Sequence, residues 1–314
     1  MTNVRPKMLD SFLGQSPIVR QVSIAMASAK SRDCSFPHMI MGGPPGLGKT
    51  TLASIIANEM GGTIISRIAS AITKPEDLVG LFEQIESLDT IIFIDEMEQL
   101  NRKISELLHT AMEDGIFTAK MKSGKIVKMD LPEFTLMGAT NYLGELPRPF
   151  LDRFKVQVNF EPYSEEEIFT IVCGAVKKMG VQATEDGARE IAQRSRGVPR
   201  VAIRYLDSAR DVHLAYPDKY KGITSKCVEE MFEIQEVDHL GLTDLDRRIL
   251  DFLSKHEKAV GMSALAQGVN EDDSTVEFAE GHLIRLDLVS RTLRGREITE
   301  HGRNHMKGLE CQQT

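Results

Sequence analysis

The feature that most constrains the fold is a glycine-rich octapeptide at residues 43–50, which reads GPPGLGKT. It follows a short apolar run at 38–42 and precedes a segment, 49–60, whose apolar residues recur at helical spacing. A strand, a glycine-rich turn and a helix in this order make a loop whose backbone N–H groups can surround phosphate oxygens, with the helix dipole behind them. The sequence therefore predicts a phosphate-binding loop in an α/β domain.

Nucleotide chemistry gives the residues of this loop distinct roles. Lys49 can reach the β- and γ-phosphates, and Thr50 can offer its hydroxyl to Mg²⁺. A glycine turn without a ligand is the alternative, which the strand and helix on either side disfavour. We expect this segment to contact ATP through Gly43, Pro44, Pro45, Gly46, Leu47, Gly48, Lys49, Thr50 and Thr51.

A second motif supplies the acids that hydrolysis needs. The apolar run 91–94 is typical of a strand buried on both faces of a parallel sheet, and it ends in Asp95 and Glu96. There Asp95 would lie near the metal ion, and Glu96 would polarise the attacking water. Acids after a strand are weak evidence alone, but downstream of a phosphate loop they predict an ATPase site.

Two polar residues lie beside further predicted strands. Asn141 follows the run 134–138 and could hold the attacking water or sense the γ-phosphate. Arg153 precedes the run 156–160, where an arginine could stabilise charge on the γ-phosphate of a neighbouring subunit, as an arginine finger does. The alternatives are a plain turn asparagine and an arginine in a structural ion pair.

Helical signals replace strand signals after residue 160. A capping box at Ser164 opens one helix, and another is predicted over 199–216 with Pro199 in its first turn. Arg200 at that helix start could contact the γ-phosphate, or it could be a solvated arginine. The chain ends in short helices and two strands over 288–298, the pattern of a winged helix.

These signals predict the fold class. We expect an α/β P-loop domain with a parallel sheet and an inserted β-hairpin at 116–131, then an all-α domain and a winged-helix domain. The expected boundaries are 1–160, 161–238 and 239–314.

Charge decides whether such a chain can bind DNA. Its net charge is −8, so binding depends on a local basic patch. Residues 285–296 hold four arginines and one acid, a local charge of +3 in an acidic chain. Phosphate contacts there would carry no sequence information and would let the protein slide along DNA; a merely solvated basic turn is the alternative. We expect DNA contacts from Arg291, Arg294 and Arg296.

Cysteine usage and hydropathy bear on the compartment. The four cysteines (Cys34, Cys173, Cys227 and Cys311) are far apart and form no C-x-x-C pair, which is typical of reduced thiols. Neither a signal peptide nor a run of 18 apolar residues is present in the sequence. We expect a cytoplasmic protein without a membrane segment.

Taken together, these stretches resemble the RuvB family of Holliday-junction branch-migration ATPases. The resemblance runs over about residues 5–300 and includes GGPPGLGKTTLASIIANEMG, FIDEMEQL, FTLMGATN and QRSRGVPRVAIRYLDSARD. It implies that the α/β domain is an AAA+ ATPase domain and that the all-α domain is its lid. It also implies the hydrolytic set Lys49, Thr50, Asp95 and Glu96, sensor 1 at Asn141, the trans-acting finger at Arg153 and sensor 2 at Arg200. It also implies an adenine pocket that includes Leu13, Gly14 and Tyr163.

The sequence departs from the family pattern at several positions. Glu98 and Gln99 replace the usual His-Arg pair after the acidic strand, and Asn141 stands where the family has threonine. Leu151 stands where an arginine precedes the finger. The hairpin 116–131, which grips the partner RuvA in the family, looks shorter here, so the partner is a RuvA-like protein, another protein, or none.

We therefore expect an ATP- and Mg²⁺-dependent motor that forms a ring, a hexamer, around duplex or four-way-junction DNA. Two alternatives remain open. One is an AAA+ loader or initiator that switches on ATP without translocating. The other is a nucleotide-gated DNA-binding adaptor with weak hydrolysis. A processive displacement assay separates the first from a motor, and DNA-stimulated turnover separates the second.

Overall fold

The computed structural model describes residues 4–312, with side chains described up to residue 307, so the side chain of Cys311 lies outside it. The chain forms two compact units. One comprises the residues through Ile171 together with Val198–Arg200, and the other comprises Val172–Gly197 and the residues from Val201 onward. The sequence predicted three domains, and that division stays a prediction, since the structure separates into these two units.

The first unit alternates strands and helices along the chain. Its elements are α1 (Ser16–Arg32), β1 (Met39–Gly42), α2 (Lys49–Met60), β2 (Ile64–Ile68), α3 (Pro75–Phe82), β3 (Ile91–Asp95), α4 (Arg102–Asp114), β4 (Ile116–Lys120), β5 (Ile126–Asp130), β6 (Thr135–Ala139), α5 (Arg148–Leu151) and β7 (Val156–Asn159). Short 3₁₀ turns lie between them: η1 (Leu9–Ser11), η2 (Ala69–Ala71), η3 (Met97–Gln99) and η4 (Leu143–Glu145).

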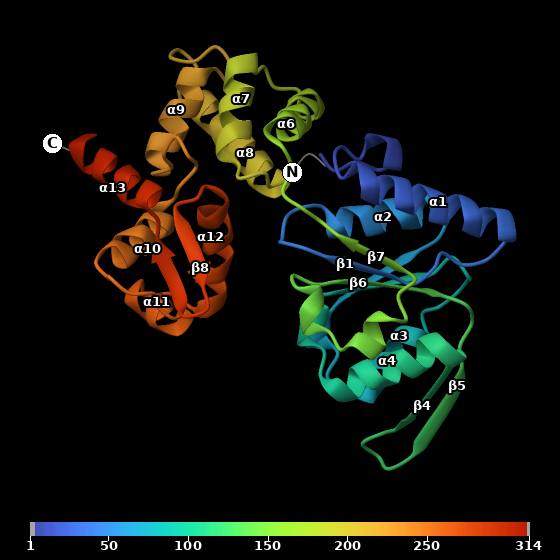
Figure 1. Cartoon of the computed structure of the whole chain (residues 1–314). Coiled ribbons are helices and arrows are strands. Elements are labelled where there is room, and N and C mark those ends of the chain that lie inside the picture. Colours follow the sequence, from blue (N-terminus) through green and yellow to red (C-terminus); the bar gives the residue numbers. More distant parts are fainter. Residues whose placement is uncertain (1–3, 313–314) are drawn as a thin grey trace. The chain divides into compact units, whose positions relative to one another are not determined.

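A five-stranded parallel sheet with strand order β2-β3-β6-β1-β7 forms the centre of this unit. Helices α1 and α2 cover one face, and α3 and α4 cover the other (Figure 1). Strand β3 is buried over residues 91–94, as an apolar run in a covered parallel sheet should be. Because all strands run the same way, the loops after β1, β3 and β6 leave the sheet at one edge.

The predicted hairpin is present as an antiparallel pair separate from the main sheet. Strands β4 and β5 pair with Thr118 opposite Lys128, and Gly124 supplies the left-handed turn residue at φ +84°. Phe117 is buried in the core of the first unit, so the base of the hairpin is anchored. Ile126 near the tip is 66% exposed, and the hairpin projects beyond α3 and α4 (Figure 1).

Helices dominate the rest of the chain. The helix α6 (Glu165–Met179) begins in the first unit, and the predicted capping box at its start is present, with Ser164 and Glu167 each accepting the other's backbone N–H. The others are α7 (Glu185–Arg194), α8 (Pro199–Ala215), α9 (Ser225–Ile234), α10 (Asp244–Ser254), α11 (Met262–Gly268), α12 (Asp273–Arg285), the wing strands β8 (Val289–Thr292) and β9 (Gly295–Ile298), and α13 (Glu300–Gln312).

Within the second unit, Arg196 joins the segment before α8 to the winged helix. Its guanidinium forms an ion pair with Asp246 of α10, which is 0% exposed, and its Nε donates to Gly241 O at 2.9 Å. Asp246 also accepts from the Thr243 N–H at 2.7 Å and so caps α10. A buried carboxylate with these partners ties helix capping to packing between the two segments.

No helix within residues 4–312 is both long enough and apolar enough to cross a bilayer. Cys34, Cys173 and Cys227 are free thiols.

We predict that Arg196→Met destabilises the second unit by about 3 kcal/mol, because it leaves the Asp246 charge buried without its partner. Denaturant unfolding followed by circular dichroism measures the change. Arg189→Met, which removes an exposed ion pair to Glu185 in the same unit, is the matched control and should leave the transition in place. Equal unfolding midpoints for the two variants would show that the ion pair between Arg196 and Asp246 does not stabilise the second unit.

Candidate nucleotide-binding site

The loop between β1 and α2 is shaped by glycines that no other residue could replace without strain. Gly46 has φ +85°, and a Cβ there would lie 2.9 Å from Val198 Cγ1. Gly43 has φ +118°, and a Cβ there would lie 2.4 Å from Phe160 O. Backbone in this left-handed region turns successive N–H groups inward, which is the geometry that binds phosphate.

Lys49, the first residue of α2, folds its side chain into this loop. It is 8% exposed, and its Nζ donates to Gly43 O and, at 3.1 Å, to Pro44 O. Burial lowers the pKa of Lys49, the carboxylates of Asp95 and Glu98 oppose that shift, and Arg200 adds to it. A buried ammonium bonded by the loop's own carbonyls fits a group that binds phosphate oxygens.

The acidic pair lies at the edge of the sheet where the loop begins. The Glu96 N–H donates to Asp95 Oδ1 at 3.0 Å, and Glu96 has φ 57° at the start of η3. Gln99 Nε2 donates to Glu96 Oε2 at 3.0 Å. The turn after β3 therefore aims the Glu96 carboxylate with help from a residue that the sequence marked only as a departure from the family.

Glu98 also lies in the site. Its Oε1 is 3.5 Å from the backbone N of Asn141, and its charge acts on Lys49. Its Oε2 is buried without a hydrogen-bond partner among the described residues. Asn141 follows β6, which pairs with β3 so that Ile94 faces Gly138, and this pairing brings the two loops together. The available sequence signal for Glu98 was its position two residues after Glu96.

The fit to magnesium rests on donor chemistry. No cluster of three His, Cys, Asp or Glu side chains in the described part of the chain could hold a metal by itself. Mg²⁺ in phosphate sites takes one or two protein oxygens and completes its shell from the phosphates and water. The Thr50 hydroxyl and the Asp95 carboxylate are of that kind and fit the ion.

The start of α8 lies on one side of the phosphate loop. The Arg200 N–H donates to Gly46 O at 3.3 Å, so Pro199 and Arg200 lie beside the loop. The contact with the γ-phosphate that the sequence suggested for Arg200 stays a prediction.

On the other side Tyr163 donates its hydroxyl to Leu47 O at 3.0 Å, and a Cβ at Gly14 would lie 2.5 Å from the tyrosine ring. Burial, with Glu167 adding to it, raises the pKa of Tyr163, so the hydroxyl stays a donor. Leu13, beside Gly14, is 39% exposed.

Arg153 lies elsewhere in the first unit, between α5 and β7. It makes an ion pair with Glu113 at 2.7 Å, so the ion-pair alternative raised from the sequence is realised within one chain. Its side chain is still 38% exposed.

The predicted DNA contacts divide into two kinds. Arg294 lies in the exposed turn of the wing, and Arg291 is 55% exposed beside Glu277. Arg296 differs from the prediction: it is 8% exposed and makes two hydrogen bonds with Glu280, at 3.0 and 3.1 Å. Its charge is neutralised inside the winged helix, because alternation along β9 turns the side chain inward. This burial disfavours the phosphate contact that the sequence suggested for Arg296, which stays a prediction.

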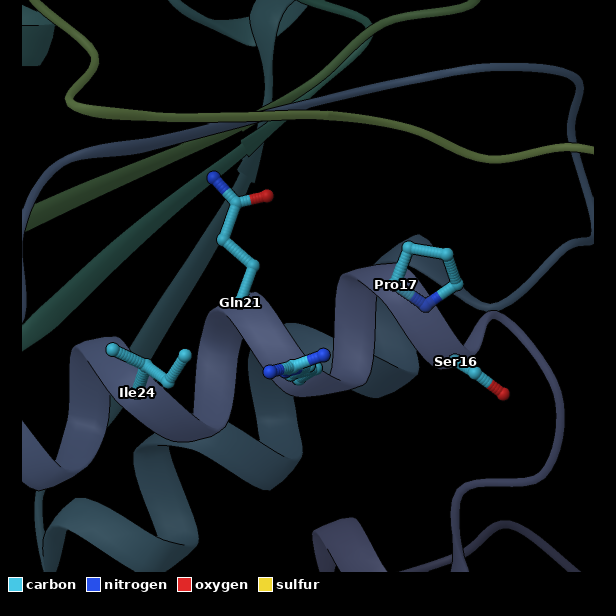
Figure 2. Close-up of a pocket in the computed structure, with 5 residues that line it drawn as sticks. Ser16, Pro17, Gln21 and Ile24 are labelled. Carbon is cyan, nitrogen blue, oxygen red and sulfur yellow. The ribbon is translucent and has the colours of Figure 1, made fainter.

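A shallow surface hollow lies on α1 (Figure 2). None of the loop residues contributes to it. It is lined by Ser16, Pro17, Arg20, Gln21 and Ile24.

Comparison with known families accounts for nearly the whole chain. The models that match describe the Holliday junction DNA helicase RuvB P-loop domain at 4–160, the RuvB AAA lid domain at 163–238 and the RuvB C-terminal winged helix domain at 239–307. The chain belongs to the RuvB family. It is a P-loop ATPase of the helicase class, as the phosphate loop and the acidic pair predicted.

Individual RuvB proteins match over nearly their full length. The Holliday junction branch migration complex subunit RuvB of Ehrlichia chaffeensis is 36% identical over 312 residues, covering 98% of this chain and 94% of the relative. Its counterpart from Fusobacterium nucleatum is 39% identical over 316 residues, with the same coverage. The RuvB Holliday junction branch migration motor of Thermotoga maritima superposes with a TM-score of 0.88 at 34% identity, covering 97% of this chain and 98% of that structure.

We predict that Gly46→Ala weakens ATP binding by about tenfold, since left-handed strain and crowding together cost about 1–2 kcal/mol. Titration calorimetry with ATP measures the affinity. Gly80→Ala on α3, where a Cβ meets nothing within 4 Å, is the control and should bind like the wild type. Equal affinities for the two variants would show that the loop does not hold the nucleotide.

Proposed function

We propose that this chain is an ATP-driven motor that moves Holliday junctions by drawing duplex DNA through a ring of identical subunits. The observation that carries the proposal is the full-length likeness to RuvB proteins, including the winged helix, joined to a complete set of phosphate-loop and acidic residues. A loader or adaptor would share the nucleotide site but would not move a junction.

The proposed roles in hydrolysis follow from the positions of the side chains. Lys49 binds the β- and γ-phosphates, and Glu96 accepts a proton from the attacking water. Asn141 orients that water at the sensor-1 position. Mg²⁺, held by Thr50 and Asp95 when it is bound, neutralises phosphate charge. Sites of this kind act mainly by positioning and electrostatic stabilisation.

Residues around the loop would bind the rest of the nucleotide. Leu13, Gly14 and Tyr163 surround the base. Arg200, whose backbone already bonds the loop, reports the state of the γ-phosphate to α8 and so to the second unit. Arg153 would act on the nucleotide of the adjoining subunit, so that hydrolysis requires assembly into a ring, which we propose is a hexamer.

DNA would meet the wing through Arg291 and Arg294, whose guanidinium groups are exposed. Such contacts read the phosphate backbone and tolerate sliding. The hairpin of β4 and β5 would bind a RuvA-like partner, since the relatives are described as subunits of a branch migration complex and the tip carries an exposed Ile126. The free cysteines support a cytoplasmic location.

We predict that Glu96→Gln keeps ATP affinity within about twofold and lowers turnover by about 10²–10⁴-fold, because the amide cannot take the proton. Steady-state hydrolysis with junction DNA, beside calorimetric binding, measures both quantities. Normal turnover in this variant would refute the assignment of the base.

A second prediction separates the wing arginines. Arg294→Ala should weaken duplex binding for all sequences and reduce the slope of log affinity against log salt by about 1, because one phosphate contact is lost. Arg296→Met should instead lower the unfolding midpoint, since it leaves Glu280 buried without its partner. Fluorescence anisotropy across a salt series and thermal melting provide the readouts; a change in salt slope for Arg296→Met alone would reverse the assignment.

A further inference from the structure

Two side chains of α4 hold the guanidinium of Arg153. Glu113 Oε2 accepts from Arg153 Nη2 at 2.7 Å, and His109 Nε2 accepts from Arg153 Nε at 2.6 Å. His109 and Glu113 are four residues apart and therefore lie on one side of the helix, next to each other. Neither residue belongs to the nucleotide site described above.

The backbone at Arg153 is fixed by buried aromatic residues. Phe150 and Phe154 are 3% and 1% exposed, and their rings meet edge to face with centroids 5.3 Å apart. The Arg153 N–H donates to Phe150 O at 3.2 Å. This packing fixes where the side chain starts but leaves its long stem free to rotate, so its charged end needs partners of its own.

The two bonds leave most of the guanidinium available. Arginine carries five N–H donors, and the bonds to His109 and Glu113 use one on Nε and one on Nη2. The remaining donors can meet phosphate oxygens. Because Arg153 Nε donates to His109 Nε2, that ring nitrogen acts as the acceptor in this arrangement.

We propose that His109 and Glu113 are positioning residues that aim Arg153 of one subunit at the nucleotide of the next. The inference rests on the proposed function, in which Arg153 acts in trans. The ion pair is exposed to solvent on both sides, at 38% and 46%, so it orients the guanidinium without burying its charge. The alternative is that His109 and Glu113 act as a latch that withholds Arg153 from the neighbouring site. In that case, removing Glu113 would raise the rate of ATP hydrolysis.

Mixing two inactive variants isolates the action of Arg153 between subunits. Glu96→Gln subunits keep Arg153 and lose hydrolysis, while Arg153→Ala subunits keep Glu96 and lose the finger. In a mixed ring, ATP turnover with junction DNA comes from an Arg153→Ala site beside a Glu96→Gln donor. Each variant alone should be inactive, and the mixture should recover activity.

Glu113→Ala is then added to one kind of subunit at a time. In the donor it should lower the recovered rate by about fivefold, the loss of roughly one hydrogen bond. In the acceptor, which has no finger to position, it should leave the rate unchanged. Glu106→Ala is the matched control, since Glu106 lies on the same helix and pairs with an arginine, Arg102, outside the finger.

His109 supplies a rescue arm. Donor His109→Gln retains a side-chain oxygen that can accept from Arg153 Nε and should keep most of the recovered rate. His109→Leu in the donor subunit removes the hydrogen-bond acceptor and should lower the recovered rate. Calorimetric ATP affinity and the unfolding midpoint, measured on each variant, should match the parent.

The outcomes separate the inference from the function beneath it. Unchanged recovery with donor Glu113→Ala, or a higher rate, overturns the positioning role, and the higher rate identifies a latch. Equal loss with the substitution in donor or acceptor indicates a structural role and also overturns it. If Glu96→Gln and Arg153→Ala subunits recover no activity together, the trans-acting assignment of Arg153 fails, and the inference fails with it.

Discussion

Parallel pairing of β1, β3 and β6 is the constraint on which the site depends. The pairing aligns Met41 with Ala139 and Ile94 with Gly138, so the phosphate loop, the acidic pair and Asn141 leave the sheet at one edge. Side chains that are far apart in the sequence therefore act on one small volume. Apolar strands covered on both faces keep that edge rigid, and rigidity is what electrostatic catalysis requires.

Much of this arrangement was predictable from the sequence, because its signals are local. The glycines at 43, 46 and 48 reveal a left-handed loop, Ser164 marks a helix start by its capping chemistry, and Gly124 marks the hairpin turn. Each of these needs only a few neighbouring residues. The resemblance to RuvB proteins added the roles of residues whose local signals are weak.

The parts that sequence could not supply depend on tertiary contacts. Arg296 lies in a run of arginines that suggests a DNA contact, yet Glu280, sixteen residues earlier, neutralises it inside the fold. Glu113 meets Arg153 across forty residues. Glu98 and Gln99, known at first only as departures from the family, bear on Asn141 and Glu96. The substituted pair therefore gives this chain its own contacts to the residues proposed to take part in hydrolysis.

We propose that a complete catalytic site forms only where two subunits meet. The most direct test is the specific ATPase activity of the purified protein, with junction DNA, over a wide range of protein concentration. We expect the activity per subunit to rise steeply with protein concentration and then to level off as rings fill. Activity strictly proportional to protein at every dilution would show that one chain hydrolyses ATP alone, and would contradict it.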